Sequence, residues 1–60
     1  MDITNKKILI LEDDDLIRAM FTEELKNVGF DADSVGLGKE AIRAITAKQY
    51  DLLLLDILNV

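Results

Sequence analysis

Two short apolar runs stand out along the chain, and polar residues flank each of them. The first covers residues 8–11 (ILIL) and the second covers residues 52–55 (LLLL). A short continuous run without alternation is typical of a strand buried on both faces of a sheet. We therefore expect two strands that are covered on both faces. Neither run approaches the roughly 20 residues that a membrane-spanning helix needs.

Between these runs, apolar residues recur at helical spacing over residues 15–28. They are Leu16, Ile17, Met20, Phe21, Leu25 and Val28. This spacing places their side chains on one face of a helix, which we expect to pack into the core. Asp14 or Asp15 is expected to cap the helix, because a short carboxylate accepts the free N–H groups of the first turn. Gly29 is typical of the position that follows a helix.

The rest of the chain predicts one more strand and one more helix. Residues 30–35 alternate weakly and contain two aspartates, as a charge-protected edge strand does. Gly36 and Gly38 mark a loop, and Ala41, Ile42 and Ile45 indicate a second helix over residues 39–48. The pattern is β-α-β-α-β, an α/β arrangement that implies parallel strands joined by right-handed crossovers.

Composition narrows the classes of function. The chain of 60 residues has no cysteine and no histidine, which excludes disulfides, thiolate zinc sites and histidine-based catalysis within it. A formal net charge of −5 argues against direct binding of nucleic acid through its phosphates. No secretory signal or membrane segment is visible, so we expect a cytoplasmic protein without a membrane partner.

Acidic residues directly follow both apolar runs. Glu12 and Asp13 come after the first run, and Asp56 comes after the second. The carboxyl ends of parallel strands meet at one edge of a sheet, so these acids converge if the two strands are neighbours. Such oxygen ligands suit Mg²⁺, and Asp56 could then attack a phosphoryl group as a carboxylate nucleophile. Taken separately, acids at a helix start more often serve as caps, and a lone aspartate after a strand more often belongs to a turn.

Three segments of the chain resemble the first half of a bacterial response-regulator receiver domain. They are ILILEDDDLIRAMFTEELKNVGF, GLGKEAIRAI and YDLLLLDI. The family's domain is a flavodoxin-like (CheY-like) parallel sheet of five strands in order 2-1-3-4-5 with five helices. The resemblance implies that residues 1–60 are a single truncated receiver-like domain with strand order 2-1-3.

The resemblance also implies a site and a role. In the family, an acidic pair after the first strand binds Mg²⁺, and an aspartate after the third strand accepts phosphate from a histidine kinase or a phosphotransfer protein. The pair corresponds to Glu12 and Asp13 and the acceptor to Asp56. Asp56 would also be a ligand of the metal, and Leu58 would offer it a backbone carbonyl. The implied protein is a phosphoacceptor module of a two-component phosphorelay, and not an enzyme. The hydroxyl residue of the family's fourth strand and the lysine of its fifth have no counterpart in these residues.

Two other functions stay open at this point. They are a self-associating structural half-domain without phosphotransfer, and a module that only binds divalent ions. In order 2-1-3 the strand at residues 52–55 lies at an edge, with no charge, proline or bulge to protect it. A core of this size without disulfides is marginally stable by itself. We therefore expect a homodimer, formed through this edge or by exchange of an element between chains.

Overall fold

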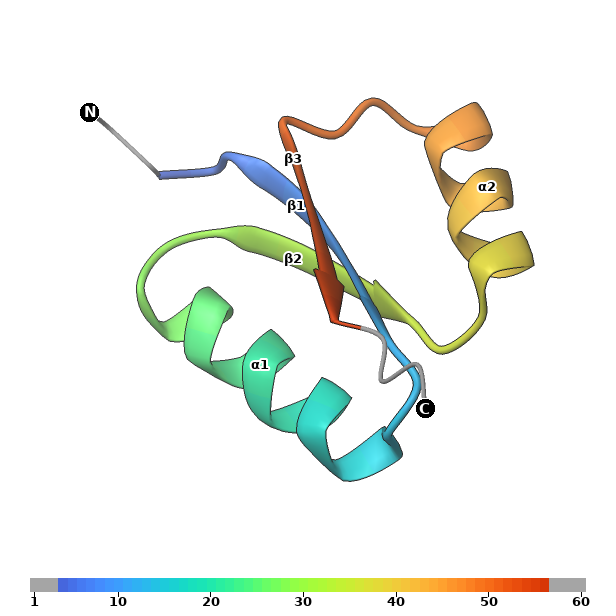
Figure 1. Cartoon of the computed structure of the whole chain (residues 1–60). Coiled ribbons are helices and arrows are strands. Elements are labelled where there is room, and N and C mark those ends of the chain that lie inside the picture. Colours follow the sequence, from blue (N-terminus) through green and yellow to red (C-terminus); the bar gives the residue numbers. More distant parts are fainter. Residues whose placement is uncertain (1–3, 57–60) are drawn as a thin grey trace.

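The computed structural model describes residues 4–56 and contains a three-stranded parallel sheet between two helices (Figure 1). The elements are β1 (Lys7–Glu12), α1 (Asp15–Asn27), β2 (Asp31–Val35), α2 (Gly38–Ala47) and β3 (Leu52–Asp56). The strand order is β2-β1-β3. The predicted α/β class, the half flavodoxin-like arrangement and the order 2-1-3 are confirmed. Neither helix of this described part is long and apolar enough to cross a membrane.

Helix boundaries follow from local hydrogen bonds and lie within one residue of the prediction. Asp14, and not Asp15, caps α1, because its Oδ1 accepts the N–H groups of Leu16 at 2.9 Å and Ile17 at 3.0 Å. The helix ends before Gly29, whose φ of 112° lies in the left-handed region that favours glycine.

At the start of α2 the capping group comes from inside the helix. Oε1 of Glu40 accepts the N–H groups of Gly36 at 3.2 Å and Leu37 at 3.1 Å. Leu37 occupies the N-cap position and has no side-chain oxygen, so Glu40 alone supplies the side-chain capping interaction. The helix therefore begins at Gly38, one residue before the predicted start.

Strand β1 forms the centre of the core because it pairs along both of its edges. It pairs with β2 from Lys7↔Asp31 to Leu11↔Val35, and with β3 from Ile8↔Leu52 to Glu12↔Asp56. Residues 8–11 are all buried, which confirms the prediction of a strand covered on both faces. Phe21, Leu25, Phe30 and Leu54 pack around this centre.

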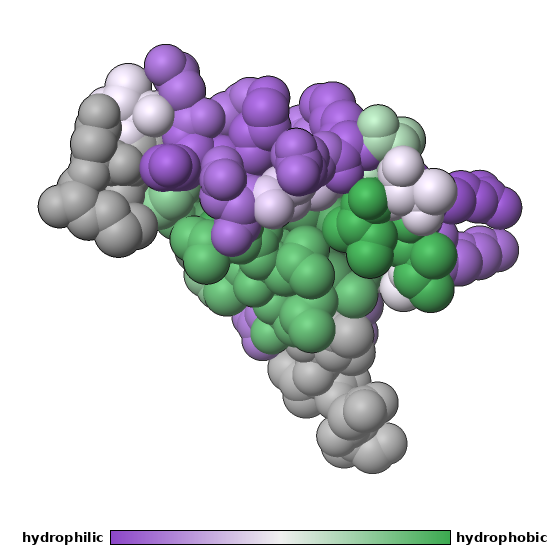
Figure 2. Space-filling view, turned by 90° about the horizontal axis from the view of Figure 1, so that it is seen from above, coloured by the Kyte–Doolittle hydropathy of each residue, from purple (hydrophilic) through white to green (hydrophobic). Residues whose placement is uncertain are grey.

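The prediction that residues 52–55 are also covered on both faces is wrong. Leu52, Leu53 and Leu55 are 47%, 51% and 63% exposed. The backbones of both helices lie close to β1 and β2, and within residues 4–56 neither helix backbone comes as close to β3. Strand β3 therefore occupies the predicted edge position with its leucines open to solvent, and Figure 2 shows a continuous hydrophobic area on this side of the molecule.

The apolar stripe of α1 is only partly buried, which corrects a second prediction. Phe21 and Leu25 pack against the core, whereas Leu16 is 72% exposed and Met20 is 55% exposed. Val28, at the C-cap, is also exposed. The stripe is wider than the surface that β1 and β2 offer to the helix, so its outer members stay in solvent.

Polar contacts fix the segment between α2 and β3. Oδ2 of Asp33, on β2, accepts hydrogen bonds from the hydroxyl of Tyr50 and from Nζ of Lys48. The N–H of Asp51 donates a hydrogen bond to the carbonyl oxygen of Lys7, and the N–H of Lys7 donates one to Oδ2 of Asp51. Both N···O distances are 2.7 Å. These contacts set the start of β3 beside the start of β1, and thereby fix the register between the two strands.

Candidate functional site

The site lies where β1 and β3 end. Glu12 and Asp56 form the last register pair between the two strands. Paired residues on neighbouring parallel strands project to the same face of the sheet, so these two carboxylates lie side by side. Asp13 follows Glu12 directly at the start of the loop to α1. The predicted meeting of the two strand ends is confirmed, whereas Leu58 lies outside the described residues.

Glu12 is the one buried charged residue among residues 4–56, with 2% of its surface exposed. Its Oε1 accepts a long hydrogen bond of 3.3 Å from the N–H of Asp14. Its Oε2 is buried and has no hydrogen-bond partner in the described part of the chain. A buried carboxylate oxygen without a partner is costly, and a bound cation is one way to satisfy it.

The electrostatics of Glu12 also favour a cation. Burial raises the pKa of Glu12 above its usual range, and the carboxylates of Asp56 and Asp13 raise it further. The hydrogen bond from the backbone of Asp14 acts in the opposite direction. Because nearby negative charges disfavour the ionised form, a positive ion at this position would favour it.

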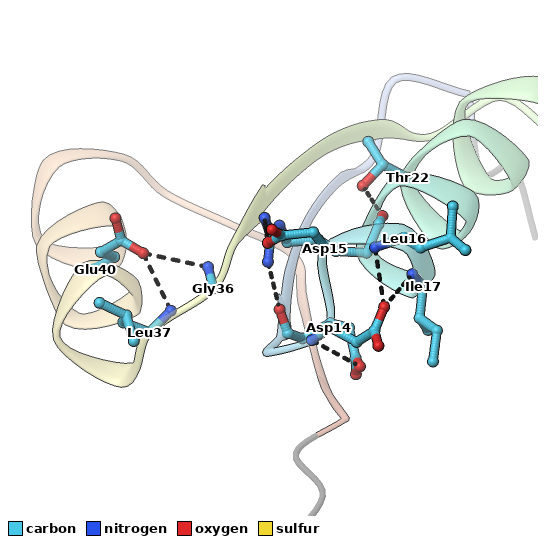
Figure 3. Close-up of polar contacts among 10 residues, drawn as sticks. Asp14, Asp15, Leu16, Ile17, Thr22, Gly36, Leu37 and Glu40 are labelled. Carbon is cyan, nitrogen blue, oxygen red and sulfur yellow. Dashed lines mark hydrogen bonds and ion pairs between the residues drawn. The ribbon is translucent and has the colours of Figure 1, made fainter.

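The acids that follow β1 divide into two groups by what they contact. Asp14 caps α1 (Figure 3), and Asp15 forms an ion pair with Nη2 of Arg18 at 2.6 Å. Glu12 and Asp13 take no part in capping and line an open pocket of about 240 Å³ together with Asp14 and Ile17. The capping interpretation of the acidic run therefore holds for Asp14 and does not hold for Glu12.

A second groove of about 490 Å³ runs along α1 and reaches Ser34 on β2. Side chains of both charges line it, including Asp15, Arg18 and Lys26. Only the smaller pocket contains the buried Glu12 carboxylate beside the strand ends. We therefore place the candidate site at the smaller pocket.

The carboxylate oxygens at this pocket are ligands that a hard cation such as Mg²⁺ could take. Within residues 4–56, no three acidic, histidine or cysteine side chains are grouped closely enough to hold a metal ion between them. Mg²⁺ keeps several waters and commonly takes only one or two carboxylates from a protein. The unpartnered Oε2 of Glu12 is the observation that favours such an ion here.

Arg18 contacts the backbone at the candidate site, which the sequence patterns did not indicate. Its Nη1 donates a 2.9 Å hydrogen bond to the backbone carbonyl oxygen of Glu12. The only signal in the sequence was its spacing of three residues from Asp15, which is typical of an ordinary helix-surface ion pair. The contact with the end of β1 depends on the tertiary structure.

Comparison with known proteins gives one family. The sequence model of the response regulator receiver domain matches residues 8–58. The DNA-binding response regulator MtrA of Mycolicibacterium smegmatis is 36% identical over 58 residues, which are 97% of this chain and 25% of that protein. The transcriptional regulatory protein CrdR of Helicobacter pylori is 38% identical over 52 residues, 87% of this chain and 24% of that protein.

A plant protein gives a similar match. Probable histidine kinase 1 of Oryza sativa subsp. indica is 41% identical over 51 residues, which are 85% of this chain and 5% of that protein. The chain thus spans about a quarter or less of the length of these curated relatives. No solved structure gives a significant match. The family match over residues 8–58 confirms the resemblance, and the chain belongs to the response regulator receiver domain family of two-component signalling proteins.

Proposed function

We propose that the chain is a phosphoacceptor module in which Asp56 receives a phosphoryl group from a histidine kinase or a phosphotransfer protein. A carboxylate oxygen of Asp56 bonds to phosphorus while the bond between phosphorus and the donor breaks, and the donor keeps the electron pair. The observation that supports this proposal most directly is that Glu12 and Asp56 are paired at the ends of β1 and β3. In this pair the buried Oε2 atom of Glu12 has no hydrogen-bond partner among the described residues. The module acts as a signalling domain and not as a classical enzyme.

In this proposal each acid has its own role. Glu12 and Asp13 hold Mg²⁺ through their carboxylates, with the backbone carbonyl of Leu58 as a further proposed ligand. The ion, when bound, neutralises charge on the phosphoryl oxygens, as in other phosphoryl transfers. Asp56 is the nucleophile. Because the carboxylate of Glu12 on the neighbouring strand binds the ion, a carboxylate oxygen of Asp56 stays free to attack phosphorus.

The test uses the sixty-residue chain with Mg²⁺ and two small phosphoryl reagents. Acetyl phosphate is expected to add one phosphoryl group slowly, as read by intact mass, since no lysine or hydroxyl of the family's later strands assists here. Beryllofluoride, which mimics a phosphoryl group, is expected to shift the backbone amide resonances of Glu12, Asp13 and Asp56. Both effects require Mg²⁺, and a chelator removes them.

Two matched variants locate the acceptor. Asp56→Asn is expected to abolish both effects, because an amide cannot act as the nucleophile. Asp31→Asn serves as the control, since Asp31 is an exposed aspartate at the opposite end of the sheet. The proposal fails if Asp56→Asn still takes up phosphate, or if neither reagent acts on the unaltered chain.

A second proposal concerns assembly, and the exposed leucines of β3 favour it. Strand β3 pairs only with β1 in the described part, so its outer edge presents unpaired backbone groups beside Leu53 and Leu55. An open apolar edge invites pairing with another strand. We propose that the sixty-residue polypeptide forms a homodimer through this edge. An antiparallel arrangement is favoured because a parallel one would bring the two Asp56 carboxylates together.

Sedimentation over a concentration series tests this assembly. Leu55→Lys is expected to give a monomer, because it places a charge at the edge, whereas Leu16→Lys on exposed α1 leaves the dimer intact. A dimer that survives Leu55→Lys would indicate exchange of an element between chains instead. A folded monomer with a thermal midpoint that does not change on dilution would overturn the proposal.

A further inference from the structure

We infer that Arg18 is a positioning residue that holds the peptide between Glu12 and Asp13, and that position 36 is glycine to leave room for it. The effect on cation binding rests on the function proposed above. The effect of Arg18 on the position of this peptide is independent of that proposed function. Arg18 is not a ligand in this scheme, since its side chain acts through the backbone that carries the two acids.

The guanidinium of Arg18 bridges two different acceptors. Nη1 donates to the carbonyl oxygen of Glu12 at 2.9 Å, and Nη2 pairs with Oδ1 of Asp15 at 2.6 Å. The Arg18 side chain is only 23% exposed. The planar fork of arginine suits such a double contact, which an ammonium group with one nitrogen cannot reproduce. Asp15 thus orients the same guanidinium that binds the end of β1.

The Glu12 carbonyl receives a hydrogen bond from Arg18 at the residue where β1 no longer pairs with β2 and pairs only with β3. The last pair between these strands is Leu11↔Val35. The next residue of the β2 chain is Gly36, whose N–H is bonded to Oε1 of Glu40 at the start of α2. Arg18 therefore supplies a donor at the point where the pairing between β1 and β2 stops. Its hydrogen bond fixes the peptide plane from which the chain turns toward Asp13.

Gly36 is needed here for space and not for backbone conformation. A Cβ atom at position 36 would lie 2.8 Å from Nη1 of Arg18, which is closer than van der Waals contact allows. Gly29 is the one glycine of the described part with positive φ, so alanine at 36 meets no conformational strain. Because the atom in the way belongs to a flexible side chain, an added methyl group would displace the guanidinium from Glu12.

This arrangement allows a test by a double-mutant cycle. Arg18→Ala and Gly36→Ala are each expected to weaken Mg²⁺ binding about tenfold, since groups that orient metal ligands commonly contribute this much. The double variant is expected to bind no more weakly than Arg18→Ala, because Gly36→Ala acts only through Arg18. Arg18→Lys should recover part of the affinity. Gly38→Ala is the control, since a Cβ atom there meets nothing within 4 Å.

A second readout follows the peptide directly. The amide nitrogen of Asp13 shares a peptide with the Glu12 carbonyl, so its ¹⁵N resonance is expected to shift in Arg18→Ala and in Gly36→Ala, and to stay in place in Gly38→Ala. Unchanged Asp13 resonances and Mg²⁺ affinities in the first two variants would overturn the inference, as would additive losses in the double variant. If the unaltered chain does not bind Mg²⁺, the proposed function fails while the Asp13 resonance still tests the role of Arg18.

Discussion

The hydroxyl of Tyr50 donates a 2.6 Å hydrogen bond to Oδ2 of Asp33, and so joins the segment before β3 to a strand that does not pair with β3. Nζ of Lys48 donates to the same oxygen at 3.1 Å. The bond from Tyr50, and then that from Lys48, holds the pKa of Asp33 below its usual range. The same carboxylate raises the pKa of Tyr50 to about 12. The crossover from α2 to β3 is therefore held by a contact that both acid and base disrupt.

Tyr50→Phe is expected to lower the free energy of unfolding by about 1 kcal/mol at neutral pH, the cost of one partly exposed hydrogen bond to a charged group. The lowered pKa of Asp33 gives stability that is present above its ordinary value of 3.8 and lost as the pH falls through the lowered pKa. The raised pKa of Tyr50 gives stability that is lost as the pH rises from 10 to about 12. Urea unfolding across this range should show the largest difference between the two proteins near neutral pH.

The tyrosine itself reports on the same contact. Tyr50 is the single tyrosine of the chain, so the ultraviolet absorbance of tyrosinate gives its titration directly. Asp33→Asn is expected to bring the pKa of Tyr50 back toward 10, because the neighbouring negative charge is removed. An unchanged titration in this variant would contradict the contact.

Asp14→Ala is expected to cost about 1 kcal/mol of stability, because two N–H groups at the start of α1 lose their acceptor. Asp14→Ser should recover most of the loss, since a hydroxyl oxygen can also cap the helix. Denaturant unfolding in the presence of a chelator measures both variants. Asp13→Ala is the matched neighbour, and an equal loss there would show that the effect is one of charge and not of capping.

Glu12→Gln is expected to raise the thermal midpoint in a chelator and to abolish any rise caused by Mg²⁺. The substitution keeps the shape of the side chain and removes a buried charge that lies beside Asp56. It also removes the oxygen that would bind the ion. A lower midpoint in the chelator, or a Mg²⁺ effect as large as that of the unaltered chain, would count against this account.

Leu9→Ala and Leu16→Ala are expected to behave very differently although both remove the same atoms. Leu9 is 1% exposed at the centre of the sheet, so its loss should cost about 3 kcal/mol and unfold much of the protein. Leu16 is 72% exposed, and its loss should change stability by less than about 0.5 kcal/mol. Circular dichroism during urea unfolding compares the two, and similar effects would contradict the burial described for α1.

The elements of the fold could be predicted because each follows from local pattern, whereas burial could not. Residues 8–11 and 52–55 are equally apolar, yet only the first run is covered. An apolar run shows which environment suits a strand, but the helices that lie against it decide its exposure. The same reason applies to Leu16 and Met20, whose positions on the apolar stripe did not reveal how much of α1 the strands cover.

The site was predicted in part for a similar reason. Glu12 and Asp56 could be placed together because strand ends in a parallel sheet share one edge. Whether Asp14 or Asp15 caps α1 depends on whether the helix begins one residue earlier or later. Helix propensity does not fix a helix end to within one residue. The contact between Arg18 and Gly36 depends on how far a helix side chain reaches toward the next loop, and neither sequence spacing nor residue type encodes that distance.

The central position of β1 also bears on the order of folding. Strand β2 joins it across a sequence separation of 24 residues, and β3 joins it across 44. Closing the longer loop costs about 0.5 kcal/mol more chain entropy, and α1 packs on β1 and β2 without help from β3. The unit formed by β1, α1 and β2 can therefore assemble first and offer β3 a ready edge. Asp56 then reaches Glu12 in the last step, so the proposed acceptor comes beside the acids that follow β1 only in chains that have completed their folding.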